Sequence, residues 1–526
     1  MKTRILLMLT LLAGLTCFAQ TVEVGGDQSG IWKADTIKVV GDVKVVDVLE
    51  VSPGTTVLFD GFYTITVTDG AAFEAKGSED DSIRFTVADT TGLFVYNSIK
   101  GGWNGFRLEK TPKVLFDYCV LEYAKASDTT DMFGGAIRIS NCKDVVIQHS
   151  TLRFNRAREH GGAVSAVNSH VVMTDCSVND NMVYSDDPIY SRYGGALRFL
   201  KCDVELRAME FLRNKGEGCI GGALSLDSCS VWLDRAVFAD NIGLNGGGLY
   251  MMRSNHLKGR LSNLLFDGNF SRHFGGGLAF ADTSPEVCNI LVTNNDSEGV
   301  TCTGLFFYQY CSPTLTNCIV YGNYPSPSEV NQDTVQMWLW TFDDYAPEFR
   351  NCLIEGKTKY MMGADNIHVF EDIVDDDPLF VDALNHDFRL SEKSPCRDAG
   401  STDTPEYVME GLDLDGLWRV ANRRIDIGPY EYTGAMVPSH LANSSQVNLV
   451  GNPLGAKSRV VFENEWNGDV VVTVYSITGR QAAQHTYHLV KSTCLDLGGL
   501  VEPLAQGVYL IEVSGEAGTF TLKAIK

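Results

Sequence analysis

The stretch that decides the fold is residues 220–241, IGGALSLDSCSVWLDRAVFADN, because its lettering recurs along the chain. Each copy begins with two glycines, then Ala or Gly and an aliphatic residue. These starts lie 25 to 33 residues apart, at Gly134, Gly161, Gly194, Gly221, Gly246 and Gly275. Each copy ends on an asparagine, at Asn155, Asn181, Asn214, Asn241, Asn269, Asn295 and Asn323. A period in this range indicates a solenoid whose units bury their apolar faces on each other.

Apolar residues alternate within the repeat, as at Leu224 and Leu226, which indicates strands. A change of parity before the asparagine places a bend there. Each copy therefore holds three short strands and three turns, with no room for a helix of about ten residues, and this predicts one coil of a parallel β-helix. The glycine pair suits a tight corner, and the asparagines can stack as an amide ladder.

The paired GGA[ILV] and FxxN signatures resemble the repeats of chlamydial polymorphic membrane proteins and, more broadly, bacterial right-handed parallel β-helix proteins. The resemblance covers roughly residues 116–323. It implies a secreted or surface-exposed rod that serves in adhesion, without naming one ligand. The fold class is therefore all-β, with a right-handed parallel β-helix over residues 20–374, in which clear repeats span 116–357, followed by a small β-sandwich.

Residues 1–19 carry Lys2 and Arg4 ahead of a short apolar run, which predicts a signal peptide and no transmembrane segment. A lipoprotein anchored through Cys17 is the alternative. The formal net charge of −23 argues against a nucleic-acid partner, since phosphate binding needs a basic face. Short alternating runs in residues 22–108 resemble opening coils, with residues 21–34 as the polar first cap. A separate small β domain is the alternative.

Two cysteine pairs, Cys202 with Cys229 and Cys318 with Cys352, occupy equivalent positions in adjacent copies. Coils stack at about 4.8 Å, which a disulfide tolerates. Stacked free thiols explain the same spacing.

Residues 375–432 change character and resemble the closing segment of bacterial β-helix proteins, so we interpret them as a C-terminal cap. Asp413, Asp415 and Arg419 are expected to form a turn that holds this cap. A calcium site at this DLDG sequence is an alternative, although oxygen ligation needs more carboxylates than it supplies. We predict no other cofactor and no other metal site.

Residues 433–446 are small and polar, as in a linker. Beyond them, residues 447–526 alternate as strands of a small β-sandwich. The ordered motifs GNP, VYSITGR, LAQGVYLIEV and the terminal TLKAIK resemble the sorting domain of type IX secretion cargo in Bacteroidetes. That resemblance implies the type IX secretion machinery as a partner, removal of this domain, and a secreted or cell-surface, outer-membrane-attached location.

A catalytic site is not predicted. His160-Gly161 and Asp186-Asp187 superficially match polygalacturonase motifs, but Gly161 is a repeat corner and the aspartates lie in an insertion. Arg138 and Arg198 are the basic residues of the outward column and lie two coils apart. A polysaccharide lyase or glycoside hydrolase on this fold stays the alternative function. A purely structural rod without a ligand is a third.

The outward side of the first strand becomes aromatic toward the C-terminal coils. The predicted binding residues are Tyr250, Phe306, Tyr308, Trp338, Trp340 and Phe342, with Ala279 and Ala281 extending a groove. Exposed rings would bind a glycan or a host or partner surface receptor. The alternative is that the loop 324–332, the segment 356–370 or the cap covers these rings.

Overall fold

The computed structural model describes residues 20–95, 98–127, 131–184, 192–216, 218–298, 302–323, 335–342, 344–401, 403–420, 424–433, 447–450, 458–476, 481–504, 508–515 and 518–525. The predicted signal peptide, nearly all of the linker, the loop 324–332 and the pair Asp186-Asp187 lie outside the described residues.

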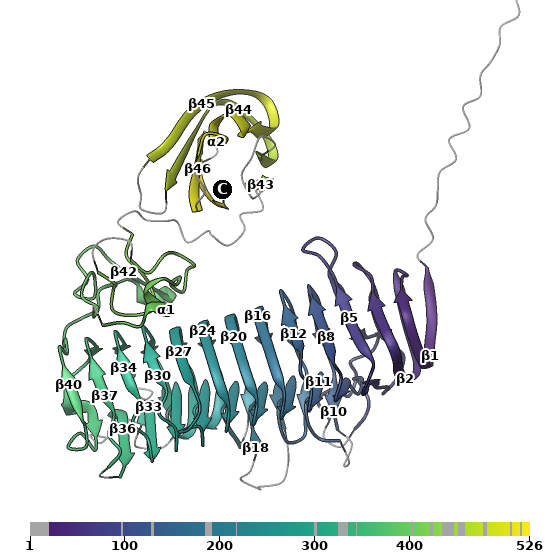
Figure 1. Ribbon diagram of the computed structural model, residues 1–526, viewed down its shortest axis with the longest axis horizontal. Helices are drawn as coiled ribbons and strands as arrows, with labels where there is room; N and C mark the ends of the chain where they lie inside the picture. The colour runs from purple at the N-terminus through teal and green to yellow at the C-terminus, as the bar shows by residue number, and fades with distance from the viewer. Residues whose placement is uncertain are drawn as a thin grey trace, which may run out of the picture.

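A parallel β-helix forms most of the described chain (Figure 1). Its 31 strands belong to one parallel sheet that winds from β1 (Thr21–Trp32) to β40 (Val369–Glu371). The opening strands stack in register on the repeat coils, as β4 does on β7, so residues 22–108 are opening coils and not a separate domain. The predicted all-β class and the parallel β-helix are confirmed.

The coils have three walls. The opening coils use β1, β2 (Thr36–Val51), β3 (Thr56–Phe59), β4 (Ile65–Val67), β5 (Ala72–Lys76) and β6 (Ile83–Val87). The first wall continues in β7 (Phe106–Glu109), β11 (Ile137–Ser140), β15 (Val164–Val167), β19 (Leu197–Leu200), β23 (Leu224–Asp227), β26 (Leu249–Met252), β29 (Leu278–Ala281), β33 (Cys302–Gln309), β36 (Val335–Thr341) and β39 (Met361–Met362). The other two walls contain β8 (Lys113–Asp117), β9 (Cys119–Glu122), β12 (Val145–Gln148), β13 (Thr151–Arg153), β16 (His170–Asn179), β20 (Asp203–Leu212), β24 (Ser230–Ala239), β27 (Gly259–Asp267), β30 (Glu286–Cys288), β31 (Leu291–Thr293), β34 (Thr314–Thr316), β35 (Ile319–Val320), β37 (Glu348–Arg350), β38 (Leu353–Ile354) and β40.

A second parallel sheet of nine very short strands was not predicted. It forms from the residues between each asparagine and the next glycine pair. Its strands are β10 (Lys125–Ala126), β14 (Arg156–Ala157), β17 (Met182–Val183), β18 (Arg192–Tyr193), β21 (Lys215–Gly216), β22 (Cys219–Ile220), β25 (Ile242–Asn245), β28 (Phe270–Phe274) and β32 (Asp296–Ser297). This outer sheet packs against part of the first wall and so decides which side chains there reach solvent.

The core lies inside the coils, where side chains alternate as predicted. Leu224 and Leu226 are fully buried. Like residues stack between coils: the rings of Phe211, Phe238 and Phe266 follow one another at 4.5 and 4.8 Å, nearly parallel. Each coil thereby buries its apolar side on the next, as a solenoid requires.

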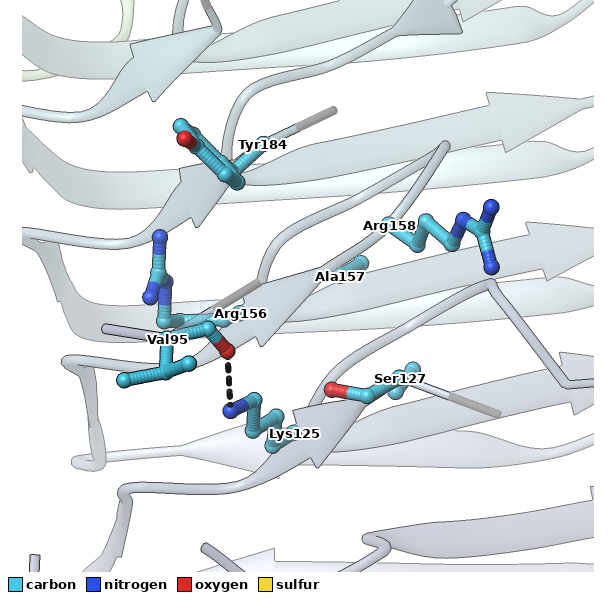
Figure 2. A pocket seen from close by; sticks show the side chains of 8 residues that line it. Val95, Lys125, Ser127, Arg156, Ala157, Arg158 and Tyr184 are labelled. Atoms are coloured by element: carbon cyan, nitrogen blue, oxygen red, sulfur yellow. Dashed lines mark hydrogen bonds between the residues drawn. The ribbon is translucent and has the colours of Figure 1, made fainter. Parts of the chain in front are cut away.

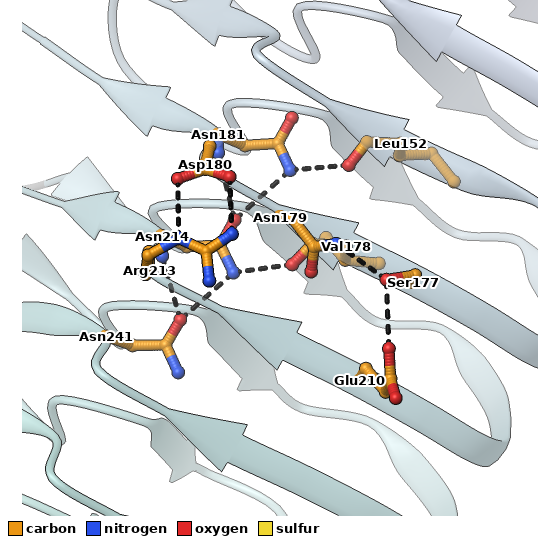
Figure 3. A network of polar contacts seen from close by, with 10 residues as sticks. All are labelled: Leu152, Ser177, Val178, Asn179, Asp180, Asn181, Glu210, Arg213, Asn214 and Asn241. Atoms are coloured by element: carbon orange, nitrogen blue, oxygen red, sulfur yellow. Dashed lines mark hydrogen bonds and ion pairs between the residues drawn. The ribbon is translucent and has the colours of Figure 1, made fainter. Parts of the chain in front are cut away.

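The predicted amide ladder is present (Figure 3). Asn181 Nδ2 donates to Asn214 Oδ1 at 3.1 Å, and Asn214 Nδ2 donates to Asn241 Oδ1 at 3.0 Å. The backbone N–H of Asn181 also donates to Asn214 Oδ1, and Asn214 Nδ2 reaches the carbonyl of Val178. The same pattern runs from Asn155 to Asn323 and passes to Gln336 at the next coil. Each buried amide is thus satisfied by its neighbours above and below.

The two glycines of each corner have different roles. Gly221 has φ 80°, a conformation that glycine adopts without steric cost. A Cβ on Gly222 would lie 2.0 Å from the carbonyl oxygen of Gly247 in the next coil. The second glycine is therefore required by the close stacking of backbones.

The cysteines of the described residues are free thiols, and all but Cys494 are buried. Cys229 Sγ accepts a hydrogen bond from the backbone N–H of Cys202 at 3.5 Å, and Cys352 Sγ accepts one from Cys318 at 3.4 Å. Of the two sequence interpretations of these pairs, the structure has the stacked thiols.

The described residues of the segment 375–432 pack along the side of the rod (Figure 1). It contains β41 (Phe380–Asp382), η2 (Ala383–Asn385), β42 (Asp387–Leu390) and α1 (Glu406–Met409). Phe388 and Ile427 pack on Leu291 and Ile319 of the third wall. The end of the solenoid is closed by residues after η1 (Lys357–Tyr360), where Ile367 and other apolar side chains pack against the main core. The segment packs there because the outer side of the third wall carries a row of apolar side chains, which includes Leu291 and Ile319.

The C-terminal residues form a separate antiparallel sheet of five strands with its own apolar core. Its elements are β43 (Val447–Val450), β44 (Arg459–Ser476), β45 (Gln481–Asp496), α2 (Gly498–Val501), β46 (Val508–Gly515) and β47 (Gly518–Ile525). The predicted strands are present. The described residues here belong to one sheet, so the two facing sheets of a sandwich are not shown.

Candidate ligand-binding face

The outward side chains of the first wall form a continuous column, because its strands pair in register. The column reads Arg107, Arg138, Ser165, Arg198, Ser225, Tyr250, Ala279, Phe306 and Trp338. A second column two residues further along ends in Tyr308 and Trp340. The wall is therefore cationic or small near its N-terminal coils and aromatic near its C-terminal coils.

The pairing of β36 with β33 differs by two residues from the register that the repeat spacing predicts. Residues 312–318 and 346–352 align at a spacing of 34, which predicts Leu339 beside Leu305. The structure instead pairs Leu339 with Phe307 and Met337 with Leu305. Ten positions separate Leu339 from Phe349 in the next wall, against eight between Phe307 and Leu315, so the connection after β36 absorbs the difference. A shift of two preserves parity, and the aromatic residues still face outward.

An exposed aromatic patch covers the outward side of β33 and β36 and the turns after them. We define this aromatic patch as Tyr308, Tyr310, Trp338, Trp340, Phe342 and Tyr345. Trp340 is 48 % exposed, Phe342 46 % and Tyr310 43 %. The Trp338 and Trp340 rings stack at 5.1 Å, and Tyr308 meets Trp340 edge-on at 5.4 Å. Tyr310 contacts Phe342 at 5.1 Å and Tyr345 at 5.2 Å.

Two of the predicted binding residues are buried and do not belong to this patch. Tyr250 is 7 % exposed and Phe306 is 4 % exposed. The ring of Phe274 from β28 lies 4.9 Å from that of Phe306, and Tyr193 and Ile220 pack on the same cluster. The outer sheet therefore covers these coils. The sequence predicted neither the outer sheet nor the burial of Tyr250 and Phe306 beneath it.

The predicted groove along Ala279 and Ala281 is also filled. Both alanines are buried in the same apolar cluster as Phe306. Small side chains in the outward column leave room that the covering residues of the outer sheet occupy. The surface that a ligand can reach thus begins at Tyr308 and Trp338 and extends toward the C-terminal end of the solenoid.

Neighbouring groups hold the patch in place. Trp338 is partly buried, with Phe274 at 5.1 Å and Phe306 at 5.5 Å. Asn366 Nδ2 donates to Thr341 Oγ1 and, at 3.2 Å, to the carbonyl of Tyr345. The segment before the last strand therefore ties down the turn that carries Phe342 and Tyr345. Rings that are fixed before binding lose little conformational entropy when a ligand arrives.

Sequence reasoning missed Tyr310 and Tyr345. Both lie beyond the strand ends, where alternation no longer says which way a side chain points. The available signal for Tyr310 was that it occupies the place after β33 that Phe342 occupies after β36. Tyr345 lies in the connection lengthened by two residues, so it aligned with nothing in the preceding coil.

The cationic side chains in the N-terminal half of the wall are paired with acidic groups or packed. Asp131 accepts hydrogen bonds from Arg107 and, at 2.9 Å, from Arg138. His160 is stacked on Phe133 at 5.0 Å, and its Nδ1 accepts the Tyr193 N–H at 3.2 Å. Burial and the nearby charges of Arg198 and Arg192 lower the pKa of His160 to about 4. A neutral histidine whose Nδ1 lone pair is already bonded is a poor general base.

The DLDG turn is held by the chain itself. Asp413 is buried, and its two carboxylate oxygens accept the backbone N–H groups of Leu417, at 2.6 Å, and Glu431, at 2.9 Å. Arg419 is buried beside it and donates to the carbonyl of Gly428. These contacts agree with a structural turn. No group of three or more His, Cys, Asp or Glu suited to a metal occurs within the residues that the structure describes.

Comparison with known proteins adds no identity to this face: no family model and no curated protein matches the chain. Among the described residues, no helix is long and apolar enough to cross a membrane.

Proposed function

We propose that this protein is a noncatalytic, secreted or cell-surface β-helix that binds a glycan through the aromatic patch. The observation that carries the proposal is the exposure of three aromatic side chains of the patch, Tyr310, Trp340 and Phe342, between 43 and 48 % each. Large exposed aromatic surfaces are uncommon on soluble proteins unless a partner covers them. Aromatic rings pack on the apolar faces of sugar rings.

The surroundings of the patch favour a sugar over a purely apolar partner. Tyr308 and Tyr310 add hydroxyl groups to the patch, and the exposed Asp344 directly precedes Tyr345 in the chain. A site for sugars needs both apolar surface and hydrogen-bonding groups, since each sugar ring has apolar faces and a hydroxyl-bearing edge. A few polar groups around aromatic surface is the usual composition of a small-molecule site.

The test compares Trp340→Ala and Phe342→Ala with Leu384→Ala in the protein lacking residues 1–19. Leu384 is 94 % exposed and lies away from the patch, so it controls for loss of an exposed apolar side chain. We expect the patch variants to lose binding on a glycan array while their melting temperatures stay within about 2 °C of the parent, as for surface substitutions. The control should bind normally.

Two results would contradict the proposal. Equal glycan binding by all three variants would remove the patch as the site. Release of oligosaccharides from a bound glycan by the purified protein would contradict the noncatalytic assignment and favour the polysaccharide-degrading alternative.

We further propose that residues 447–526 direct export by type IX secretion. The support is the ordered set of four motifs, together with an apolar core that is separate from that of the rod. Deleting residues 447–526 should leave the solenoid folded but keep it in the periplasm, because two separate cores can fold independently. Protease shaving of intact cells measures this, and normal surface display of the truncated chain would refute it.

A further inference from the structure

Two cationic side chains are buried next to each other on adjacent strands of the outer sheet. Lys125 on β10 pairs in register with Arg156 on β14. Lys125 is 3 % exposed and Arg156 6 % exposed. Within the described chain, no carboxylate forms an ion pair with either residue, although the protein as a whole carries a net charge of −23. Two adjacent buried cations without an anion are costly, because burial removes hydration and the charges repel.

Lys125 uses its three N–H groups on backbone carbonyls. Its Nζ lies 3.0 Å from the carbonyl oxygens of Gly92 and Val95 and 3.5 Å from that of Lys100. These contacts hold the loop that precedes β7, but they leave the positive charge uncompensated. Burial and the charge of Arg156 accordingly lower the pKa of Lys125 to about 8. An anion nearby would favour the charged form.

Arg156 keeps hydrogen-bonding capacity that the described residues do not use. One terminal nitrogen donates to the carbonyl of Leu93 at 2.7 Å and the other meets Met182 Sδ at 3.1 Å. Its Nε is buried and has no partner among the described residues. Figure 2 shows the guanidinium between Val95 and Tyr184, and the rings of Phe94 and Tyr184 lie 4.9 and 5.3 Å from it. These aromatic faces orient the Arg156 guanidinium but do not neutralise its positive charge.

A pocket of about 290 Å³, including space open to solvent, lies against these two cations (Figure 2). Its lining includes Val95, Lys125, Ser127, Arg156, Arg158 and Tyr184, over the small side chains Ala126 and Ala157. A guanidinium presents parallel N–H groups that match a carboxylate or a sulfate.

We propose that this pocket is an oxyanion site that takes a carboxylate or sulfate group, with Arg156 donating hydrogen bonds and Lys125 contributing its charge. Ser127 can add a hydroxyl donor at the pocket wall. This site involves none of the residues of the aromatic patch. It therefore stands independently of the proposed glycan binding.

The experiment titrates the protein lacking residues 1–19 with sodium sulfate and, separately, with sodium galacturonate, using neutral galactose as the blank. Calorimetry at constant ionic strength gives the affinity. We expect saturable binding of sulfate, of galacturonate, or of both, and none of galactose. Arg156→Gln should weaken binding at least about tenfold, because charge-assisted hydrogen bonds are lost. Arg213→Gln removes an exposed arginine that pairs with Asp180 and should leave binding unchanged.

Arg156→Lys tests the planar guanidinium separately from the positive charge. It also provides a second test if the glutamine variant does not fold. It keeps the positive charge that holds the loop but lacks the planar fork, so its melting temperature should stay near the parent while binding weakens. Binding of sulfate alone would assign a free-ion site, and preference for galacturonate would assign an acidic sugar. Absence of saturable binding of either probe to the parent protein would overturn the proposal and leave both cations as loop anchors.

Discussion

Two columns of side chains run along the same coils but follow opposite rules. The asparagine ladder at the inner corner keeps one residue type from Asn155 to Asn323, and every member is buried and hydrogen-bonded to the next. The outward column of the first wall changes from arginine and serine to aromatic residues over the same distance. An inner position meets its own copy above and below, so only a self-complementary residue fits. A side chain at an outer position contacts the outer sheet or solvent and not its own copy, so the residue type can vary from coil to coil.

The largest expected effect tests the inward side of the first wall. Leu226→Ala should lower the free energy of unfolding by about 2–5 kcal/mol, because it opens a cavity in a fully buried stack. Ser225→Ala is the matched control on the outward side. Ser225 is also buried, but its hydroxyl has no partner among the described residues, so its removal should change stability by less than about 0.5 kcal/mol or raise it. Equal losses of unfolding free energy for Leu226→Ala and Ser225→Ala in urea denaturation would contradict the assignment of Leu226 as inward and Ser225 as outward.

A somewhat smaller effect is expected in the ladder. Asn214→Ala removes the acceptor of the Asn181 N–H and the donor to the Val178 carbonyl. Buried groups left unpaired cost about 1–3 kcal/mol each, so we expect a loss of roughly 2–4 kcal/mol in urea denaturation. Lys215→Ala, at the exposed next residue, should have little effect. A loss at Asn214 no greater than at Lys215 would mean that the ladder does not stabilise the coils.

The smallest expected effect lies in the aromatic patch. Trp340→Ala should lower the free energy of unfolding by less than about 1 kcal/mol, because nearly half of the side chain is already exposed. Phe306→Ala, one coil away and buried, should cost about 3–5 kcal/mol. Thermal unfolding of the two variants measures the difference. A destabilisation at Trp340 as large as at Phe306 would show that the patch is covered in solution.

The sequence by itself determined the features that depend on contacts between adjacent coils. The solenoid, the inward direction of Leu224 and Leu226, the glycine corners and the amide ladder all follow from a repeated pattern, since each copy supplies the neighbour of the next. Parity also placed Tyr308, Trp338 and Trp340 on the outer side, even where the register was two residues off.

Only the tertiary structure decided the features that depend on the path of the connections. The short segments after the asparagines form an outer sheet that buries Tyr250 and Phe306 and leaves Trp340 exposed. The segment 375–432 docks on the side of the rod because the third wall presents an apolar stripe there. The oxyanion pocket joins a loop near Val95 to Lys125 and Arg156 from two later coils. Such contacts join residues that no period relates, so their geometry is set by packing in space and not by local sequence.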